Sequence, residues 1–220
     1  MSIPIELLQL QRWSEGRFAD REAVGAALAG ALAPYADAPD LIILALPRGG
    51  VPVGSAVAEA LHAPLDLVLV RKLGVPDQPE LAMGAIAEGG VTVLNEDVVH
   101  ALRIAPTELR SVAAAEQREL ERRARVYRGE QPPPDLQNRT AILVDDGLAT
   151  GTTMRAAIKA VQKQHPRQVI VAVPVGAPET VALIRPTVDN VVTLMQPRHF
   201  GAVGLWYADF RQTSDAEVCE

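Results

Sequence analysis

The sequence predicts an α/β protein built on a parallel β-sheet that is flanked by helices. Five short apolar runs punctuate its 220 residues, and most of them lack polar alternation. Runs of this kind are typical of strands that are buried on both faces. Ala-rich segments with helical spacing separate several of the runs, and strands that alternate with helices indicate βαβ units. The runs are Leu41 to Leu46, Leu65 to Val70, Thr140 to Asp145, Val169 to Val175 and Asn190 to Met195.

Two of the intervening segments show the helical spacing clearly. Val53, Val57 and Leu61 recur at four-residue intervals after the first run, and Met154 and Ile158 repeat that interval after the third. Residues three or four apart lie on the same face of a helix. We therefore expect a helix to follow each of these two strands and to pack against the sheet.

The stretch between the second and third runs is too long for a single crossover. Residues 71–80 contain a glycine and two prolines, so we expect a mobile loop there. Residues 83–94 hold a Glu-Gly-Gly break between apolar pieces, which predicts a β-hairpin. Residues 106–128 start with proline, are rich in Ala, Glu and Arg, and precede a glycine, which predicts a long helix. Its apolar stripe is only partial, so this helix is expected at the domain edge, and residues 131–135 form a stiff linker.

The last segment, residues 196–220, concentrates the aromatic side chains. We expect it to form a small hood or arm over a core of residues 1–195, whose insertion spans about 71–130. Its rings could stack on a flat ligand, but for any one of them packing onto the core is the more common role. The aromatic residues of this segment are Phe200, Trp206, Tyr207 and Phe210.

Composition narrows the function classes. The net charge is −6, which argues against nucleic-acid binding because such proteins usually carry a basic face. The single cysteine, Cys219, excludes an internal disulfide and a zinc cluster. The N-terminus does not read as a signal peptide, and no apolar run approaches the roughly 20 residues that span a bilayer. We expect a cytoplasmic protein without membrane or nucleic-acid partners.

The stretch VDDGLATGTT, Val144 to Thr153, contains the main candidate ligand-binding residues. Asp145 ends an apolar strand and Thr152 opens the next helix, so the turn lies where open α/β sheets bind ligands. Its small residues allow close approach of a ligand to the backbone. Successive N–H groups and the helix N-terminus form an anion site, which suits a phosphate.

The two carboxylates, Asp145 and Asp146, require a different partner. Neutral hydroxyls, Mg²⁺ or a developing positive charge would suit them, and a sugar phosphate bound to Mg²⁺ offers all three. The alternative is that the acids cap the following helix. A P-loop is excluded because the glycines are too close and no lysine follows, and the chain has no GxGxxG, GxSxG or HExxH.

ILVDDGLATGTT resembles the ribose-phosphate motif of the type I phosphoribosyltransferases. The resemblance covers roughly residues 41–195 and implies a Rossmann-like, five-stranded parallel sheet with a mobile loop and a hood. LVRKLG, which follows the second strand, is similar to the start of the mobile loop in adenine phosphoribosyltransferases. The whole arrangement also resembles bacterial phosphoribosyltransferase-like proteins of unassigned substrate.

This resemblance implies 5-phosphoribosyl-1-pyrophosphate (PRPP) as substrate, with Mg²⁺ as cofactor. Asp145 and Asp146 match the acid pair that engages the ribose 2- and 3-hydroxyls and stabilises the charge that develops as pyrophosphate departs. The same pair would hold the metal, directly or through water or the ribose hydroxyls. The residues that match the 5-phosphate loop are Gly147, Ala149, Thr150, Gly151, Thr152 and Thr153.

Two further segments match parts of the pyrophosphate site. Arg48, Gly49 and Gly50 match the loop after the first strand, where glycine amides would donate to the diphosphate and the family often has an unusual or cis peptide. The alternative is a simple tight turn. Arg71 and Lys72 would stabilise the leaving pyrophosphate when the loop closes, and the alternative is a pair of surface cations.

One departure from the family narrows the acceptor. The enzymes for 6-oxopurines usually carry a third acid in the phosphate loop, and that position is Ala149 here. We therefore expect transfer to a different nitrogenous, nucleobase-like ring in nucleotide metabolism and nucleoside salvage. A PRPP-sensing regulator without turnover is the alternative, and a protein that hydrolyses PRPP is a weaker one. Family members often dimerise, so we expect a homodimer, and Leu81 to Ala87 together with the long helix is the candidate interface.

Overall fold

The centre of the molecule is a five-stranded sheet with the strand order β10-β9-β8-β3-β4. The computed structural model describes residues 13–14 and 16–219. Every pair of neighbouring strands in this sheet is parallel, which confirms the predicted fold class. The strands are β3 (Leu41–Ala45), β4 (Leu65–Leu67), β8 (Thr140–Val144), β9 (Gln168–Val175) and β10 (Asn190–Met195).

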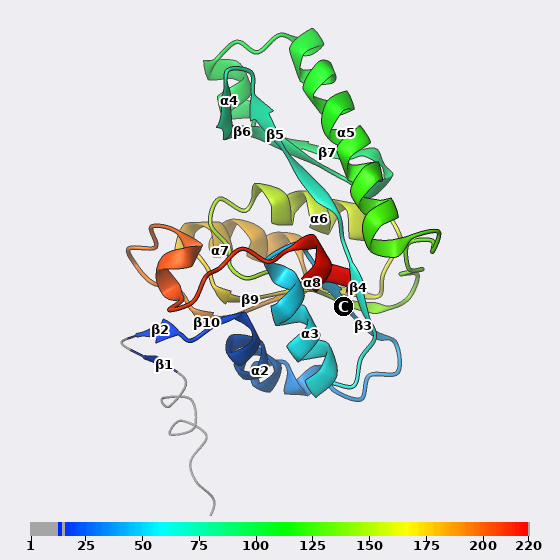
Figure 1. Ribbon diagram of the computed structural model, residues 1–220, viewed down its shortest axis with the longest axis vertical. Coiled ribbons are helices and arrows are strands. Elements are labelled where there is room, and N and C mark those ends of the chain that lie inside the picture. Colours follow the sequence, from blue (N-terminus) through cyan, green and yellow to red (C-terminus); the bar gives the residue numbers. More distant parts are fainter. Residues whose placement is uncertain (1–12, 15, 220) are drawn as a thin grey trace, which may run out of the picture.

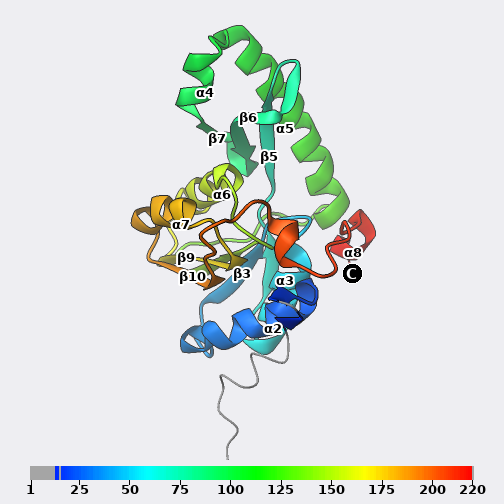
Figure 2. The same cartoon turned by 90° about the vertical axis from the view of Figure 1, so that its left-hand side faces the viewer.

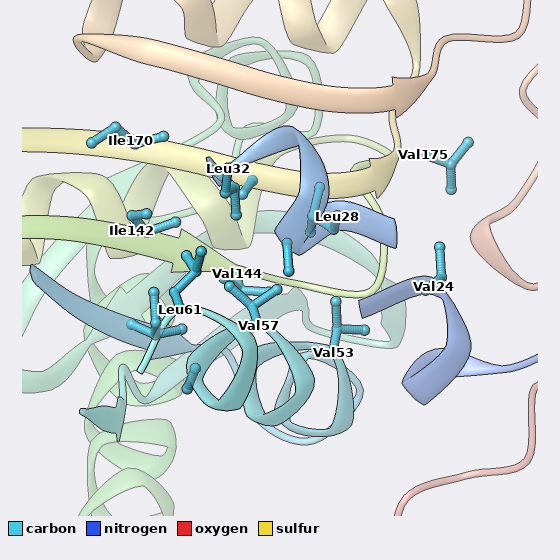
Figure 3. Close-up of a cluster of buried hydrophobic side chains, with 14 of the residues drawn as sticks. Val24, Leu28, Leu32, Val53, Val57, Leu61, Ile142, Val144, Ile170 and Val175 are labelled. Atoms are coloured by element: carbon cyan, nitrogen blue, oxygen red, sulfur yellow. The ribbon is translucent and has the colours of Figure 1, made fainter. Parts of the chain in front are cut away.

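Helices cover both faces of this sheet (Figure 1). On one side lie α2 (Arg21–Ala31) and α3 (Gly50–Ala60), and on the other lie α6 (Thr152–Gln162) and α7 (Pro178–Ile184). Successive strand side chains enter the two cores alternately: Ile43 packs toward α2 and α3, whereas Ile42 packs toward α6. Figure 3 shows the core on the side of α2 and α3. Burial on both faces explains why the strand sequences are continuously apolar.

The strand order reverses between β3 and β8. The strand that follows β3 in the chain, β4, lies on one side of it, while β8 pairs with its other side. Loops that leave neighbouring parallel strands at such a reversal diverge and open a crevice beyond the carboxyl ends of the strands. The loops after β3 and β8 are the two segments that the sequence predicts as ligand-binding.

The insertion between β4 and β8 forms a second, antiparallel sheet of three strands (Figure 1). The predicted hairpin and the predicted long helix are both confirmed. The helix ends at Gly129, whose φ of 62° favours glycine. The elements are β5 (Val70–Val75), β6 (Gln78–Ala87), β7 (Val91–Leu94), α4 (Glu96–Ala101) and α5 (Pro106–Arg128).

The prediction of a loop over residues 71–80 is wrong, because these residues form most of β5 and the start of β6. Leu73 and Val75 are buried in a core shared with α5, and this burial favours the strand. Gly74 lies at a register shift between β5 and β6, and Asp77 has a φ of 64° in the turn between them. The predicted single strand over residues 65–70 is wrong as well, since only β4 belongs to the parallel sheet and Val70 opens β5.

The antiparallel sheet is covered on both faces. Met83 and Ile86 pack with α5, whereas Ala85 and Ala87 pack with α6. Residues 83–87 are therefore buried within the chain, so only Leu81 and Ala82 of the candidate dimer interface over residues 81–87 are accessible, and the homodimer stays a prediction. None of the helices in the described part of the chain is both long and apolar enough to span a membrane.

Segments near the two ends of the described chain pair with each other. The backbone of Ala208 donates to the Phe18 carbonyl oxygen at 2.7 Å, and that of Asp209 donates to the Ala19 carbonyl oxygen at 2.9 Å. Tyr207 is 2% exposed and its ring centroid lies 5.5 Å from that of Phe18, which confirms packing as its role. The remaining elements are β1 (Trp13–Ser14), β2 (Arg17–Phe18), α8 (Asp215–Cys219) and the 3-10 helices η1 (Ala33–Tyr35), η2 (Glu88–Gly90), η3 (Arg185–Thr187) and η4 (Val203–Trp206).

The C-terminal helix α8 lies beside the end of α5 (Figure 2). The Tyr127 hydroxyl donates to Asp215 Oδ1 at 2.6 Å. We expect Tyr127→Phe to lower the free energy of unfolding by about 0.5–1.5 kcal/mol, the usual net contribution of one hydrogen bond. Urea unfolding in a double-mutant cycle with Asp215→Ala measures the contact. The same loss from Tyr127→Phe in the presence and absence of Asp215 would contradict this interpretation.

Candidate active site

The loop after β3 lies directly against the acid pair. A Cβ on Gly49 would be 2.1 Å from Asp146 Oδ2, and a Cβ on Gly50 would be 2.7 Å from the Val144 carbonyl oxygen. Gly49 has an ordinary φ of −61°, so close approach rather than a special turn requires glycine there. The peptide between Pro47 and Arg48 is cis, in the loop where the family resemblance implies an unusual peptide.

Of the two glycine N–H groups in this loop that are predicted to donate to a diphosphate, only one is without a partner in the described part of the chain. The Gly50 N–H donates to the Leu46 carbonyl oxygen at 3.0 Å, so it is not free to bind a ligand in this conformation. The Gly49 N–H has no hydrogen-bond partner among residues 13–14 and 16–219. Gly49 therefore remains a candidate donor to a diphosphate, whereas Gly50 contributes through the close packing that its missing side chain allows.

Each carboxylate of the acid pair has one oxygen held by the protein and one open oxygen. Asp145 Oδ1 accepts from the Asp146 backbone N–H at 2.8 Å, and Asp146 Oδ2 accepts from Arg21 Nε at 2.9 Å. The other two oxygens accept no hydrogen bond from another described residue, and neither is sealed from solvent. An open oxygen on each of two consecutive residues can accept hydrogen bonds from two neighbouring hydroxyl groups or can face a cation.

The electrostatics of the pair favour a positively charged or hydrogen-bond-donating partner. Burial raises the pKa of Asp145 well above its usual range, and the charge of Asp146 raises it further. Burial also raises the pKa of Asp146, while the Arg21 guanidinium acts in the opposite direction on both carboxyl groups. Two buried neighbouring carboxylates are costly to ionise together, so a ligand that supplies charge or donors stabilises them.

Arg21 is the site residue that the sequence does not reveal. It opens α2, 125 residues before Asp146, and no motif or spacing connects the two. Asp20 caps this helix by accepting from the Ala23 backbone N–H at 2.7 Å, which fixes where the helix begins. Only the folded structure brings the guanidinium to the acid pair.

The small-residue loop after β8 presents backbone N–H groups without partners. Its two flanks are held by hydrogen bonds: Leu148 N–H donates to the Val175 carbonyl oxygen and Arg155 N–H to the Gly151 carbonyl oxygen, both at 2.8 Å. Between them Gly151 adopts a left-handed φ of 74° at the start of α6. Within the described part of the chain, the N–H groups of residues 149–153 have no hydrogen-bond partner. This is the arrangement of an anion nest at a helix N-terminus.

Two other contacts shape this loop. The Thr180 hydroxyl donates to the Ala149 carbonyl oxygen and so ties the loop backbone to α7. A Cβ on Gly147 would lie 2.6 Å from Val203 Cγ1, so the start of the loop packs directly under the C-terminal segment. The predicted phosphate loop is therefore held in shape by α7 and by η4.

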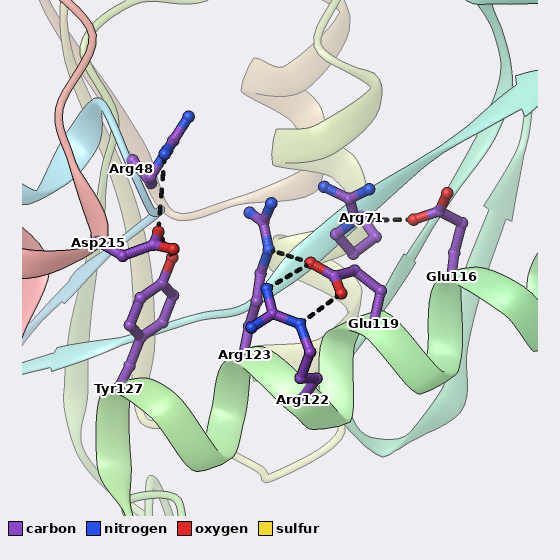
Figure 4. Close-up of polar contacts among 8 residues, drawn as sticks. All are labelled: Arg48, Arg71, Glu116, Glu119, Arg122, Arg123, Tyr127 and Asp215. Atoms are coloured by element: carbon purple, nitrogen blue, oxygen red, sulfur yellow. Dashed lines mark hydrogen bonds and ion pairs between the residues drawn. The ribbon is translucent and has the colours of Figure 1, made fainter.

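Two of the predicted cations, Arg48 and Arg71, form ion pairs with carboxylates outside the acid pair (Figure 4). Arg48 Nη1 lies 3.7 Å from Asp215 Oδ1, and Arg71 Nε lies 2.7 Å from Glu116 Oε2 on α5. Arg71 and Lys72 belong to β5 of the antiparallel sheet, not to a loop beside the acid pair. Their roles toward pyrophosphate stay predictions.

A cavity of about 390 Å³ adjoins the acid pair through Arg21. It lies between the start of α2, the start of α3 and the C-terminal segment, and its lining mixes cations with carboxylates. A polar ligand fits such a lining better than an apolar one. The lining includes Asp20, Arg21, Glu22, Pro52, Arg211 and Thr213.

The donor set is compatible with Mg²⁺ held jointly with a substrate. No group of three or more His, Cys, Asp or Glu side chains capable of holding a metal occurs in the described residues. Mg²⁺ is usually bound through one or two carboxylates together with substrate phosphates and water. Asp145 and Asp146, each with an open oxygen, meet that smaller requirement.

An acid pair and an unpartnered amide loop thus lie together at the switch point of a parallel sheet, as we expect of a site for a phosphorylated ligand with hydroxyl groups. Residues 19–207 match the family described as phosphoribosyl transferase domain, and the chain belongs to this family. That match covers the parallel sheet, the insertion and both loops of the site.

Two curated relatives agree with this assignment, and two solved structures share the fold. Two Mycobacterium tuberculosis proteins named "Putative phosphoribosyl transferase", from strains CDC 1551 and H37Rv, are 46% identical over 201 residues, which is 91% of this chain and 45% of theirs. The chain thus spans about half the length of these curated relatives. The crystal structure of TT1426 from Thermus thermophilus is similar, with 45% identity, a TM-score of 0.76, and coverage of 92% of this chain and 95% of that one. AQ2163 from Aquifex aeolicus shares the fold, at 12% identity, a TM-score of 0.51, and coverage of 88% and 84%.

Proposed function

We propose that this protein transfers the 5-phosphoribosyl group from PRPP to a nitrogenous acceptor and releases pyrophosphate. The observation that carries the proposal is the meeting of two open carboxylate oxygens, on Asp145 and Asp146, with the unpartnered amides of residues 149–153. The two features suit the two ends of one ligand. The amides suit the 5-phosphate, and the open oxygens suit the ribose 2- and 3-hydroxyls.

The same arrangement accounts for the chemistry. As the bond between the ribose carbon and pyrophosphate breaks, the leaving group takes the electron pair and positive charge develops on the sugar. The carboxylates of Asp145 and Asp146 stabilise that charge from a preorganised position. The acceptor nitrogen then forms the new bond to that ribose carbon, and its proton passes to the departing pyrophosphate or to water. Mg²⁺, when bound, neutralises diphosphate charge, and Asp145 and Asp146 would hold it directly or through water.

We place the acceptor in the cavity beside Arg21. Its polar lining supports a ring with hydrogen-bonding edges, and Ala149 lacks the carboxylate that 6-oxopurine enzymes usually carry at that position. These two observations favour a nucleobase-like ring of the adenine, uracil or orotate kind over hypoxanthine or guanine.

The test is pyrophosphate release from PRPP and Mg²⁺ in the presence of single acceptors. Adenine, uracil, orotate, hypoxanthine and guanine form a first panel. We expect release that depends on one acceptor from the first three. PRPP binding without release from any acceptor would instead favour the sensor, and release without an acceptor would favour a hydrolase.

Arg71→Ala is expected to slow turnover more than it weakens PRPP binding, because a cation that acts on leaving pyrophosphate is needed chiefly in the transition state. We expect kcat to fall by about 10- to 100-fold, equivalent to roughly 1.4–2.7 kcal/mol, while KM for PRPP changes by less than about threefold. Steady-state kinetics measure both quantities. Arg118→Ala, which removes an exposed arginine from α5, serves as the control. Equal losses in kcat and in PRPP affinity would contradict the transition-state role.

A further inference from the structure

We propose that Arg21 is a positioning residue for the acid pair: it fixes the Asp146 carboxylate so that Oδ1 faces the sugar hydroxyls. The inference rests on the proposed PRPP site and adds a residue to it from outside the two loops. Three observations support it: the contacts of the Arg21 guanidinium, the close approach of Gly49 to Asp146, and the burial of the Arg21 and Asp146 side chains.

The guanidinium is held on several sides. Nε and Nη2 both approach Asp146 Oδ2, at 2.9 and 2.8 Å, and Nη1 donates to the Arg211 carbonyl oxygen at 2.7 Å. The Cζ atom lies 4.0 Å from the centre of the Phe210 ring. Because each nitrogen of the fork has a partner and one face is stacked, the group has one defined orientation.

Gly49 and Tyr207 restrict Asp146 as well. Gly49 leaves no room beyond Oδ2, since even a methyl group there would be 2.1 Å from that oxygen. The Tyr207 hydroxyl donates to the Asp146 carbonyl oxygen at 2.6 Å and thus holds the backbone. Oδ2 therefore has both the guanidinium and the Gly49 backbone as close neighbours, which leaves Oδ1 as the oxygen that can face a ligand.

The burial of this ion pair favours a role in orientation over one in stability. The side chains of Arg21 and Asp146 are only 10% and 14% exposed. A buried pair stabilises a fold little, because the loss of hydration offsets the attraction between the charges. It also leaves the three charged groups, Asp145, Asp146 and Arg21, with a net charge of −1 when all are ionised. That charge repels an anionic substrate less than a bare acid pair would.

The predicted signature is discrimination between ribose 5-phosphate and 2-deoxyribose 5-phosphate. A hydroxyl bonded to a correctly placed carboxylate strengthens binding by about tenfold or more, so the wild-type protein should prefer the ribose compound by at least that factor. In Arg21→Met the preference should fall below about threefold, because Oδ1 is no longer held in place. Arg21→Lys keeps the positive charge but lacks the planar guanidinium. It should therefore bind PRPP like the wild type without keeping the preference for the ribose compound.

Calorimetry or ligand-observed NMR with both sugars, and with PRPP and Mg²⁺, measures these ratios. Arg17→Met, at an exposed arginine four residues away, is the matched control and should keep the wild-type preference. If Arg21→Met does not fold, Phe210→Leu removes the ring stacked on the guanidinium and should lower the preference in the same direction.

The outcomes separate this role from the proposed function. Failure of the wild-type protein to bind PRPP overturns both. PRPP binding by the wild type, together with an unchanged sugar preference in Arg21→Met, overturns only the role of Arg21, as does an unchanged preference in Phe210→Leu where Arg21→Met does not fold. Full recovery of the preference in Arg21→Lys shows that charge alone is needed and also overturns it.

Discussion

Replacement of both acids, Asp145→Asn with Asp146→Asn, is expected to lower kcat/KM for PRPP by about 10²- to 10³-fold or more. A loss of this size is typical when one preorganised group that stabilises transition-state charge is removed. The double variant removes the negative charge that faces the sugar, while its amide groups keep the size of the side chains. Pyrophosphate release measures the rate, and calorimetry measures PRPP affinity.

The two substitutions differ in their expected effect on folding, which provides the control. Asp145→Asn relieves the cost of burying a carboxylate beside a second one, so it should leave stability unchanged or raise it. Asp146→Asn leaves the buried Arg21 guanidinium without its counter-charge and should cost up to about 3 kcal/mol. Thermal unfolding of both single variants therefore separates loss of function from loss of structure. Unchanged PRPP binding in a folded double variant would contradict the ribose role.

Gly49→Ala is the second substitution with a large expected effect. The added methyl would lie 2.1 Å from Asp146 Oδ2, the oxygen that Arg21 also holds, so the carboxylate must move. Displacement of the carboxylate loses its hydrogen bond to the sugar, which contributes about 1.5–3 kcal/mol for a charged acceptor, so we expect PRPP affinity to fall by about 10- to 100-fold. The φ of −61° is suitable for alanine, so the chain should still fold.

Gly30→Ala is the matched control for this prediction. Gly30 lies inside α2, and nothing comes within 4 Å of an added Cβ. Alanine favours helix over glycine, so this variant should be as stable as the wild type or more so, with unchanged PRPP affinity. Calorimetry on both variants provides the comparison. Equal PRPP affinity in Gly49→Ala and the wild type would show that the loop and the acid pair do not form one site.

The parallel sheet could be predicted because strands that are buried on both faces have continuously apolar sequences. The strands that hold Ile43, Ile142 and Ile170 are apolar without alternation, and all three residues are buried in the core beneath the site. Glycines and carboxylates at the ends of such strands point to a ligand site with little ambiguity.

Strand β5 and Arg21 could not be predicted, for two different reasons. The glycine and the prolines in and around β5 predict a loop when only neighbouring residues are considered. The segment is a strand because its apolar side chains pack against α5. Arg21 reaches Asp146 only because the N-terminal and C-terminal segments pair with each other over the site. Contacts of that range have no periodicity or spacing that a single sequence could reveal.

The central claim is that the acid pair and the amide loop after β8 together bind PRPP. Calorimetric titration of PRPP with Mg²⁺ into the wild-type protein, and into the Asp145→Asn, Asp146→Asn variant, tests it most directly. We predict saturable binding with one site per chain for the wild type and a loss of at least about tenfold in affinity for the variant. Absence of PRPP binding to the folded wild-type protein would contradict the claim.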